Sequence, residues 1–267
     1  MRFLSAAHTD IGITKQINQD SFCLKIAKTP KSNIAFSVLC DGMGGLKKGE
    51  LASSSVVNTF SEWFENVLPG VVDKSDDFNI IISMWKEIII SQGKKIYDYG
   101  HSRGFSLGTT ITAILIINDN YVAVNVGDSR IYIIRGSQMR QVTRDHNYWL
   151  RLQEMVANGQ MTKEEAMAKR QKEALISFLG IGNVNLMDVN TQPFEMQYGD
   201  VVMLCSDGIT KTLSDEQIHG IIVSDIVSME DKAKTLVNAA ITGNTHSQDN
   251  TSVAILQYKE SIINKER

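Results

Sequence analysis

The sequence is poor in residues that interrupt or cross-link a chain, with only three prolines and three cysteines among 267 residues. Cys23, Cys40 and Cys205 lie in or beside apolar stretches and form no CxxC pair. We interpret them as small buried hydrophobic residues in a reducing compartment. Because no repeat, low-complexity tract or proline-rich linker divides the chain, we predict one domain over residues 1–260, followed by a C-terminal tail at 261–267.

Long apolar stretches are also missing. The most apolar segment, residues 80–90, is interrupted by Ser83, Lys86 and Glu87, whereas a membrane-spanning helix needs ~20 consecutive apolar residues. The first ten residues contain no apolar run long enough for a signal peptide. We therefore expect a cytoplasmic protein that does not associate with a membrane.

Neither sign of charge dominates, since the chain has 27 Lys and Arg residues and 30 Asp and Glu residues, with a formal net charge of −3. This balance argues against a nucleic-acid-binding protein, which normally carries a basic stripe. The five histidines show neither HxH nor HExxH spacing, which argues against a zinc site. The P-loop pattern GxxxxGKS/T is missing as well, which excludes a P-loop nucleotide hydrolase.

Short apolar runs typical of strands alternate in blocks with helical patterns. The strand-like runs cover residues 22–27, 34–40, 109–117, 121–126, 131–135, 201–205 and 252–258. Helical spacing predicts two helices over residues 50–68 and 76–99, and serine caps predict two more beginning near Ser214 and Ser228. Blocks of helices and strands predict an α+β fold in which helices cover antiparallel sheets.

Residues 144–178 differ from the strand-rich stretches on either side. They are charged and helical in pattern, and Thr162 with Glu165 has the spacing of a capping box. We interpret this segment as an inserted subdomain, or flap, beside the main body.

Acidic residues occur at the ends of several strand-like runs. Asp41, Asp128 and Asp207 each follow an apolar run. Asp20 lies just before the first predicted strand and Asp249 just before the last. Asp-Gly after a strand is an ordinary turn signal when it occurs alone, but five such acidic sites together favour a shared role.

The glycines after two of these aspartates, Gly42 and Gly208, are interpreted as residues that permit sharp turns. Carboxylates that converge on one edge of a sandwich repel each other unless cations neutralise them. Oxygen ligands suit Mg²⁺ and Mn²⁺, and two such ions ~4 Å apart can activate a water and bind a phosphoryl group. The residues alone therefore predict a dinuclear metal-dependent phosphoester hydrolase.

Six short motifs follow one another along the chain. They are Thr-Asp-Ile-Gly-Ile-Thr-Lys-Gln-Ile-Asn-Gln-Asp-Ser (9–21), Asp-Gly-Met-Gly-Gly (41–45), Gly-Thr-Thr (108–110), Gly-Asp-Ser-Arg (127–130), Cys-Ser-Asp-Gly (205–208) and Asp-Asn-Thr (249–251). In this order they resemble the type-2C metal-dependent protein phosphatases, the PPM family, and its bacterial members in particular. The resemblance spans about residues 5–257, and it implies a four-layer α-β-β-α sandwich of two antiparallel sheets flanked by helices, in which residues 144–178 match the family's flap.

The resemblance also implies which residues hold two Mn²⁺ or Mg²⁺ ions. Asp41, Asp207 and Asp249 would bind the first ion. Asp41 would also bridge to the second ion, which the carbonyl group of Gly42 joins. Asp20 would contact the site mainly through metal-bound water, so that Asp20 and Asp41 are the expected catalytic residues.

Three further positions carry expectations from the same resemblance. Asp128 would bind, together with Asp207, a third and weaker ion. Lys15 stands where the family usually has an arginine that grips the substrate phosphate, so we expect weaker phosphate binding at Lys15. Met43 cannot donate a proton to the leaving group, so a metal-bound water or another group would have to do so. Four supporting residues are interpreted as structural and stay outside the catalytic set: Thr109, Thr110, Arg130 and Asn250.

The implied activity is hydrolysis of phosphoserine and phosphothreonine in proteins by direct attack of the bridging water, opposing a Ser/Thr protein kinase. We expect the enzyme to be a monomer. One alternative is a binding module that has the same fold but no activity. Only Lys15 supports this alternative. The other is a phosphohydrolase that acts on small molecules or nucleotides.

Overall fold

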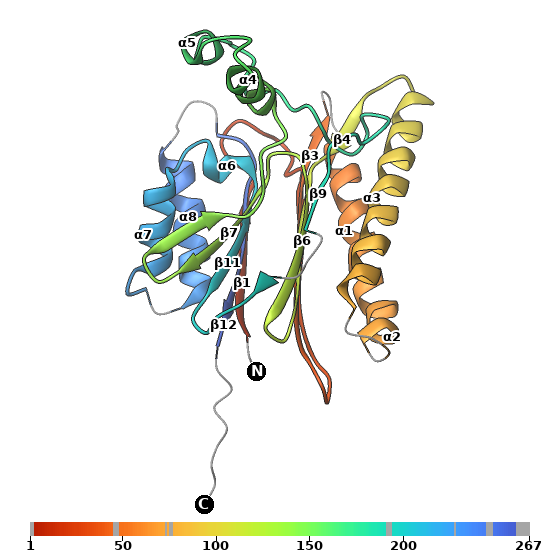
Figure 1. Ribbon diagram of the computed structural model, residues 1–267, viewed down its shortest axis with the longest axis vertical. Coiled ribbons are helices and arrows are strands. Elements are labelled where there is room, and N and C mark those ends of the chain that lie inside the picture. The colour runs from red at the N-terminus through yellow and green to blue at the C-terminus, as the bar shows by residue number, and fades with distance from the viewer. Residues whose placement is uncertain are drawn as a thin grey trace, which may run out of the picture.

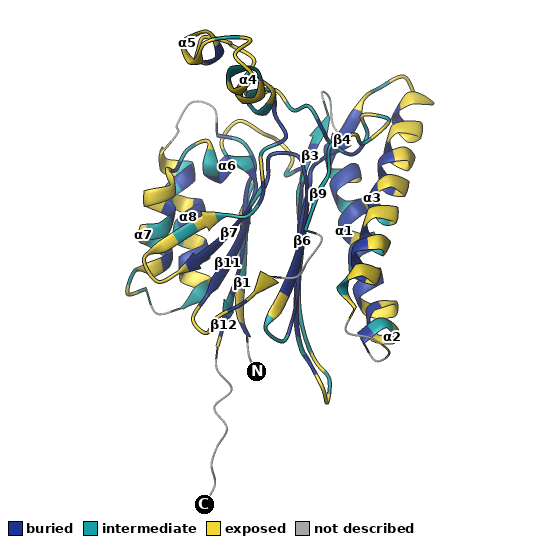
Figure 2. Ribbon diagram, viewed as in Figure 1, coloured by how far each residue is buried: buried dark blue, intermediate teal, exposed yellow. Residues whose placement is uncertain are grey.

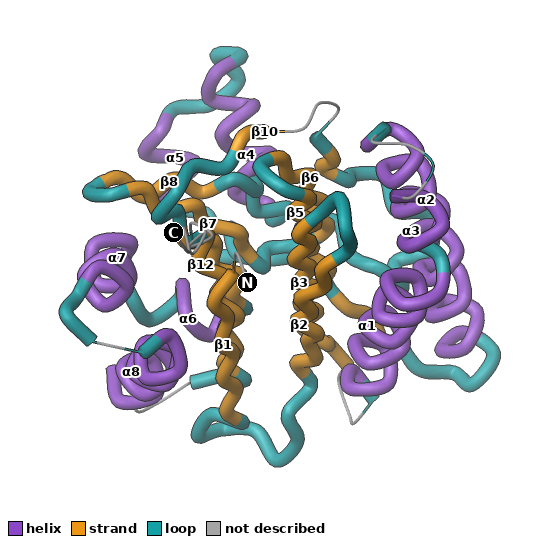
Figure 3. The backbone as a smooth tube through the Cα atoms, turned by 90° about the horizontal axis from the view of Figure 1, so that it is seen from below, coloured by secondary structure: helices purple, strands orange, loops and turns teal. Residues whose placement is uncertain are grey.

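Two antiparallel sheets pack face to face, and helices cover the outer face of each sheet. The computed structural model describes residues 3–44, 48–72, 74, 77–190, 194–226, 228–243 and 248–259. Seen along the sheets, the layers follow one another as helices, strands, strands and helices (Figure 3). The predicted α+β four-layer sandwich is thus confirmed. The proposed tail at 261–267 and Gly45 of the second motif lie outside the described residues.

The first sheet has the strand order β1-β12-β11-β7-β8. Its strands are β1 (Phe3–Asp10), β12 (Thr251–Tyr258), β11 (Val201–Cys205), β7 (Arg130–Arg135) and β8 (Gln138–Gln141). Each pair of neighbouring strands in this sheet is antiparallel. The last strand of the described chain therefore lies inside this sheet, between the first strand and β11.

The second sheet has the order β10-β6-β5-β3-β2, with β4 paired to β3 and β9 paired to β6. Its strands are β10 (Phe194–Glu195), β6 (Asn120–Val126), β5 (Ile111–Ile117), β3 (Asn33–Gly44), β2 (Asp20–Lys28), β4 (Leu107–Thr109) and β9 (Asp188–Val189). β5 and β6 form a hairpin, and Asn118 adopts a φ of 55° in its turn, a conformation that asparagine tolerates better than most residues.

Helices on the two outer faces leave their polar sides in water. The second sheet is covered by α1 (Gly49–Asn66), α2 (Leu68–Val72) and α3 (Phe78–His101), and the first by α6 (Asp207–Thr210), α7 (Asp215–Val223) and α8 (Met229–Gly243). Figure 2 shows buried strands between helices whose outward faces are exposed. Among the described residues, no helix has the length and apolar character needed to span a membrane.

Strand β3 shows how the period-2 pattern separates two cores. Phe36, Val38 and Cys40 point into the core beneath α1 and α3, whereas Ala35 and Leu39 point into the core between the two sheets. Successive side chains of a strand point to opposite faces, so a strand that is buried on both sides must be apolar throughout. A third core fills the space between the first sheet and its helices.

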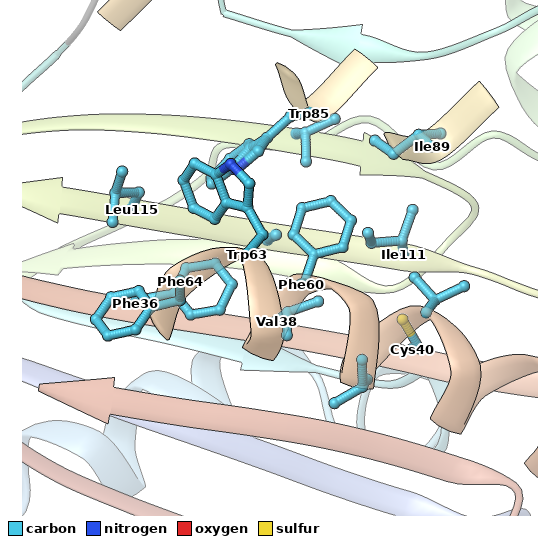
Figure 4. Close-up of a cluster of buried hydrophobic side chains, with 14 of the residues drawn as sticks. Phe36, Val38, Cys40, Phe60, Trp63, Phe64, Trp85, Ile89, Ile111 and Leu115 are labelled. Atoms are coloured by element: carbon cyan, nitrogen blue, oxygen red, sulfur yellow. The ribbon is translucent and has the colours of Figure 1, made fainter. Parts of the chain in front are cut away.

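An aromatic cluster joins β3 to α1 and α3 (Figure 4). The ring centroid of Phe36 lies 5.3 Å from that of Phe64, 6.2 Å from Trp85 and 6.3 Å from Trp63. Trp85 also contacts Phe60 edge to face at 5.7 Å. Burying a large apolar side chain contributes roughly 1.5–3 kcal/mol, so this cluster fixes α1 and α3 against the strand that carries Asp41.

Most predicted elements are confirmed, and two details are wrong. Strand β1 (Phe3–Asp10) precedes the strand that we expected to be the first. The run expected at 109–117 is broken at Thr110 into β4 and β5. Pro69 lies within the short helix α2; proline is tolerated in a first helical turn because its missing N–H has no partner there.

Residues 144–178 contain α4 (Tyr148–Ala157) and α5 (Lys163–Met167). Figure 1 shows both helices standing beyond the sandwich, at the end where α6 lies. The capping box of Thr162 and Glu165 is present at the start of α5, as expected. That residues 144–178 act as a separate functional unit, the flap, stays a prediction.

Candidate metal and phosphate site

Two aspartates face each other where β2 begins. Asp20 and Asp41 are direct partners in the antiparallel register of β2 and β3, a placement that brings Cβ atoms to ~4.5–5.5 Å. β3 continues beyond Asp41 to Gly44 and pairs with β4. The sharp turn expected after Asp41 is therefore wrong, and the carboxylate is held by a continuous strand.

Glycine is required at positions 42 and 208 because another backbone segment approaches closely there, and not because the chain makes a turn. A Cβ atom on Gly42 would lie 2.3 Å from the Gly49 carbonyl oxygen, and one on Gly208 would lie 2.2 Å from the Asn250 carbonyl oxygen. The φ of both glycines lies outside the positive range. Glycine lets α1 approach β3 here, and it lets α6 approach the start of β12.

The other sheet supplies two carboxylates from neighbouring strands. Asp207 is the first residue of α6 and follows β11, and Asp249 lies just before β12. Gln248 ties the two segments together. Its Nε2 donates to the Gly208 carbonyl at 2.9 Å, and its Oε1 accepts from the Thr212 hydroxyl at 2.8 Å.

Asn250 holds the loop formed by residues 11–19 against the start of β12. Its side-chain nitrogen donates to two backbone carbonyls of this loop, at 2.8 and 3.2 Å, and its side-chain oxygen accepts from the Gln19 N–H at 2.9 Å. Gly12, with a φ of +75°, lies so close that a Cβ atom would be 2.3 Å from the Asp249 carbonyl oxygen. These contacts bring the loop that carries Lys15 next to Asp249.

Asp128 lies between β6 and β7 and is 7% exposed. A hydroxyl relay connects its segment to β3. The Thr110 Oγ1 accepts from the Asp41 N–H at 2.9 Å and lies 2.9 Å from the Ser129 Oγ. Thr110 lies between β4 and β5, and it links the residue after Asp128 to the backbone of Asp41.

The carboxylates raise one another's pKa. Burial and the charges of Asp207 and Asp20 place the pKa of Asp41 well above its ordinary value, and Asp128 and Asp249 add to this effect. Burial raises the pKa of Asp20 to about 7 although Ser252 and Ser206 act against it, and burial with the charge of Asp207 raises the pKa of Asp128 to about 7. The other four expected aspartates are thus within electrostatic reach of Asp41.

Two lysines reach the edges of this cluster. The Lys15 Nζ lies 2.8 Å from the Asp249 Oδ1, and both side chains are about 40% exposed. Lys211 pairs with the Asp207 Oδ2. Burial acts to lower the pKa of Lys211, but the charges of Asp207 and Asp128 outweigh it and raise this pKa above its ordinary value.

The cluster fits hard divalent cations by the chemistry of its donors. In the described part of the chain, no three Asp, Glu, His or Cys side chains are grouped closely enough to hold an ion by themselves. Asp20 Oδ1 and Asp207 Oδ1, however, are buried without a hydrogen-bond partner, and an unpaired buried acceptor costs roughly 1–3 kcal/mol or more when charged. Buried oxygens that lack donors are suited to a cation of the Mg²⁺ or Mn²⁺ type.

Ion pairs fix the base of residues 144–178. Arg130 contacts the Asp145 carboxylate through Nε at 2.9 Å and through Nη2 at 2.6 Å, which agrees with the structural interpretation of Arg130. Asp188 receives two hydrogen bonds from Arg144, at 2.6 and 2.9 Å, and lies 3.3 Å from the His146 Nε2. The segment is thus anchored to β7 through Arg130 and to β9 through Asp188.

Comparison with known proteins decides the family. Residues 12–244 match the family described as protein phosphatase 2C. The chain belongs to this family. It is 31% identical over 254 residues to the protein phosphatase PhpP of Streptococcus pneumoniae, covering 94% of this chain and 96% of that protein.

Solved structures agree with the assignment of this chain to the protein phosphatase 2C family. The serine/threonine phosphatase of Streptococcus agalactiae superposes with a TM-score of 0.81 at 29% identity, over 96% of this chain and 100% of that one. The catalytic domain of the phosphatase PstP, in complex with two manganese ions, superposes with a TM-score of 0.73 at 25% identity, over 97% and 99% of the two chains. The resemblance deduced from the six motifs is confirmed.

Sequence reasoning missed two functional neighbours of the aspartates. Gln248 precedes Asp249 in the last motif, but nothing in the sequence indicated that it joins Gly208 to this segment. Lys211 was missed because a lysine four residues after an aspartate looks like an ordinary pair on a helix surface. The spacing from Asp207 was the only available signal.

Proposed function

We propose that this phosphatase hydrolyses phosphoserine and phosphothreonine in proteins with the help of two divalent cations, Mn²⁺ or Mg²⁺, at the aspartate cluster. The observation that carries the proposal is the direct pairing of Asp20 with Asp41 beside Asp207. Ionised carboxylates at such separations destabilise a fold unless a cation binds them. The names of the S. pneumoniae and S. agalactiae relatives support a phosphoprotein substrate.

Four residues would hold the ions: Asp41, Asp207, Asp249 and, through its carbonyl group, Gly42. Bound there, the ions would lower the pKa of a water and neutralise charge on the phosphoryl group. Asp20 accepts a hydrogen bond from the Ser206 hydroxyl at 2.8 Å through Oδ2. Its other oxygen, Oδ1, has no protein donor and is available to accept a hydrogen bond from the attacking water and orient it.

Lys15 would bind the substrate phosphate from the rim of the site. Its side chain is 39% exposed and that of its partner Asp249 is 40% exposed, so the contact can be exchanged for one with a phosphate oxygen at little cost. An ammonium is a point charge, however, and does not offer the two-pronged geometry of a guanidinium. Lys15 therefore attracts the phosphate but orients it less strictly than an arginine would.

Hydrolysis of p-nitrophenyl phosphate and of a phosphothreonine peptide tests this function. We expect turnover in Mn²⁺ or Mg²⁺, its loss in EDTA, and its loss in Asp41→Asn. Asp98→Asn, which removes one carboxylate from the exposed part of α3, is the matched control and should keep full activity. Turnover that survives EDTA, or that persists in both Asp41→Asn and Asp207→Asn, would overturn the metal assignment.

The same assay separates the alternatives. Faster turnover of sugar phosphates or nucleotides than of phosphopeptides would favour a small-molecule phosphohydrolase. Folded protein without turnover in any metal would favour a binding module. We propose that the opposing enzyme is a Ser/Thr protein kinase that phosphorylates the same substrates. The cytoplasmic location and the monomeric state stay predictions.

A further inference from the structure

A lysine lies where the two carboxylates expected to share a third ion approach each other. Lys211 pairs with the Asp207 Oδ2. The charge of Lys211 also lowers the pKa of Asp128. The charge of Asp207, which raises this pKa, is the largest charge effect on Asp128. The ammonium group therefore lies among carboxylates that come from two different sheets.

The local structure directs Lys211 to this place. Helix α6 is only four residues long, and the Lys211 N–H donates to the Asp207 carbonyl at 2.8 Å. The turn of helix puts the two side chains on one face, because residues four apart on a helix are neighbours. The Asp207 carboxylate is 13% exposed, so the lysine enters the cluster from its solvent side.

Asp207 divides its two oxygens between different tasks. Oδ2 carries the contact with Lys211, whereas Oδ1 is buried and has no protein donor. Lys211 thus occupies one oxygen of Asp207 and leaves the other for an ion shared with Asp41. A divalent ion between Asp207 and Asp128 would have to displace an ammonium group of like charge.

We propose that the Lys211 ammonium takes the place of the third, weaker ion, so that this phosphatase binds two divalent ions and carries its third cation as a side chain. The inference rests on the proposed two-ion site. Lys15 has no such role, because its contact in the cluster is Asp249.

Counting bound Mn²⁺ tests the proposal without an activity assay. Equilibrium dialysis at saturating Mn²⁺, followed by metal analysis, should give two ions per chain for the wild type. Lys211→Met removes the charge without adding a metal ligand and should bind a third, weaker ion. That ion should be lost again in Lys211→Met/Asp128→Asn, while Lys211→Arg and Lys15→Met should bind two.

Each other result has a defined meaning. Three ions in the wild type, one of them lost in Asp128→Asn, would show that Lys211 does not replace an ion. Two ions in a folded Lys211→Met, checked by circular dichroism, would also overturn the proposal. A wild type that binds no Mn²⁺ would instead refute the two-ion site itself, and with it the proposed function. A wild-type count of three ions or of none overturns the respective proposal even if a variant fails to fold.

Discussion

Asp20 and Asp41 stand directly opposite each other on β2 and β3, at the end of a sheet that is otherwise apolar at its centre. Like charges in directly paired positions of a sheet destabilise it. The aromatic cluster beneath α1 and α3 supplies the packing energy that holds β3 in place in spite of this repulsion. Stability and metal binding are therefore coupled at these two residues.

Removing one of these charges should stabilise the metal-free enzyme. Asp41 has a raised pKa, so its ionised form costs folding free energy at neutral pH. We expect Asp41→Asn in EDTA at pH 7.5 to melt above the wild type, by ~2–4 °C for each ~1 kcal/mol relieved. Excess Mn²⁺ should reverse the order, since binding stabilises only the chain that holds the ions. Calorimetry checks both, with Asp98→Asn as the control, and a lower melting temperature for Asp41→Asn in EDTA would contradict this coupling.

Alanine at Gly42 should be far more harmful than alanine at an uncrowded glycine. The new Cβ atom would lie 2.3 Å from the Gly49 carbonyl oxygen and 2.5 Å from that of Gln19, which forces α1 away from β3. We expect a loss of ~3 kcal/mol or more, as for severe overpacking, together with loss of activity.

Gly220 in α7 provides the matched control, because no heavy atom lies within 4 Å of a Cβ built there. Gly220→Ala should stabilise the protein by ~0.5–1 kcal/mol, the usual gain for this replacement inside a helix. Urea denaturation measures both variants. Similar midpoints for Gly42→Ala and Gly220→Ala would refute the close-approach explanation.

Replacing Lys15 by arginine should improve phosphate binding. A guanidinium can form two parallel hydrogen bonds to a phosphate, a gain of ~1 kcal/mol over a single ammonium contact, or about 5-fold in KM. Lys15→Met should raise KM instead. Steady-state kinetics on a phosphothreonine peptide compares the three enzymes, and an unchanged KM and kcat in Lys15→Arg would contradict the assignment of this residue to the phosphate.

Asp188→Asn should loosen the base of residues 144–178. Although burial acts to raise it, hydrogen bonds from Arg144 and the neighbouring His146 hold the pKa of Asp188 well below its ordinary value of 3.8. A depressed pKa means that this stabilisation is complete above the unfolded pKa and is lost as the pH falls through the folded one. We expect Asp188→Asn to cost about 1 kcal/mol at pH 7, after allowance for partial exposure.

Two measurements follow from this expectation. Hydrogen exchange at pH 7 should quicken within residues 144–178 more than in α8, which is remote from Asp188. The difference in stability between wild type and Asp188→Asn should shrink as the pH falls below about 4, because the aspartate of the unfolded chain then takes up a proton while Asp188 in the folded chain stays ionised. A difference that stays constant from pH 7 to pH 3 would exclude the ionised pair as its cause.

The sequence predicted the elements whose own residues carry a strong pattern. β3, β5 and β11 are largely apolar because both of their faces are buried, with Ser37 and Thr112 as buried polar exceptions, and such runs are visible without a structure. β1 was missed, since Phe3–Asp10 has mixed burial and owes its register to β12, about 250 residues away in the chain. Pairing over that distance leaves no local signal.

The order of the motifs predicted which aspartates gather, but not how the backbone holds them. Gly42 was interpreted from the Asp-Gly pair as a turn, whereas the neighbouring helix α1 is what requires glycine there. Lys211 was overlooked for a similar reason. Its distance from Asp128 depends on the packing of two sheets, which no spacing within the sequence reveals.

The position of β12 has a consequence for how the enzyme is made. This strand is inserted between β1 and β11, and Asn250 at its start holds the loop of residues 11–19. A growing chain that has reached only α8 lacks Asp249, and its first and last site segments cannot meet. Dephosphorylating activity should therefore be absent from partial translation products, and it should begin only when β12 has left the ribosome.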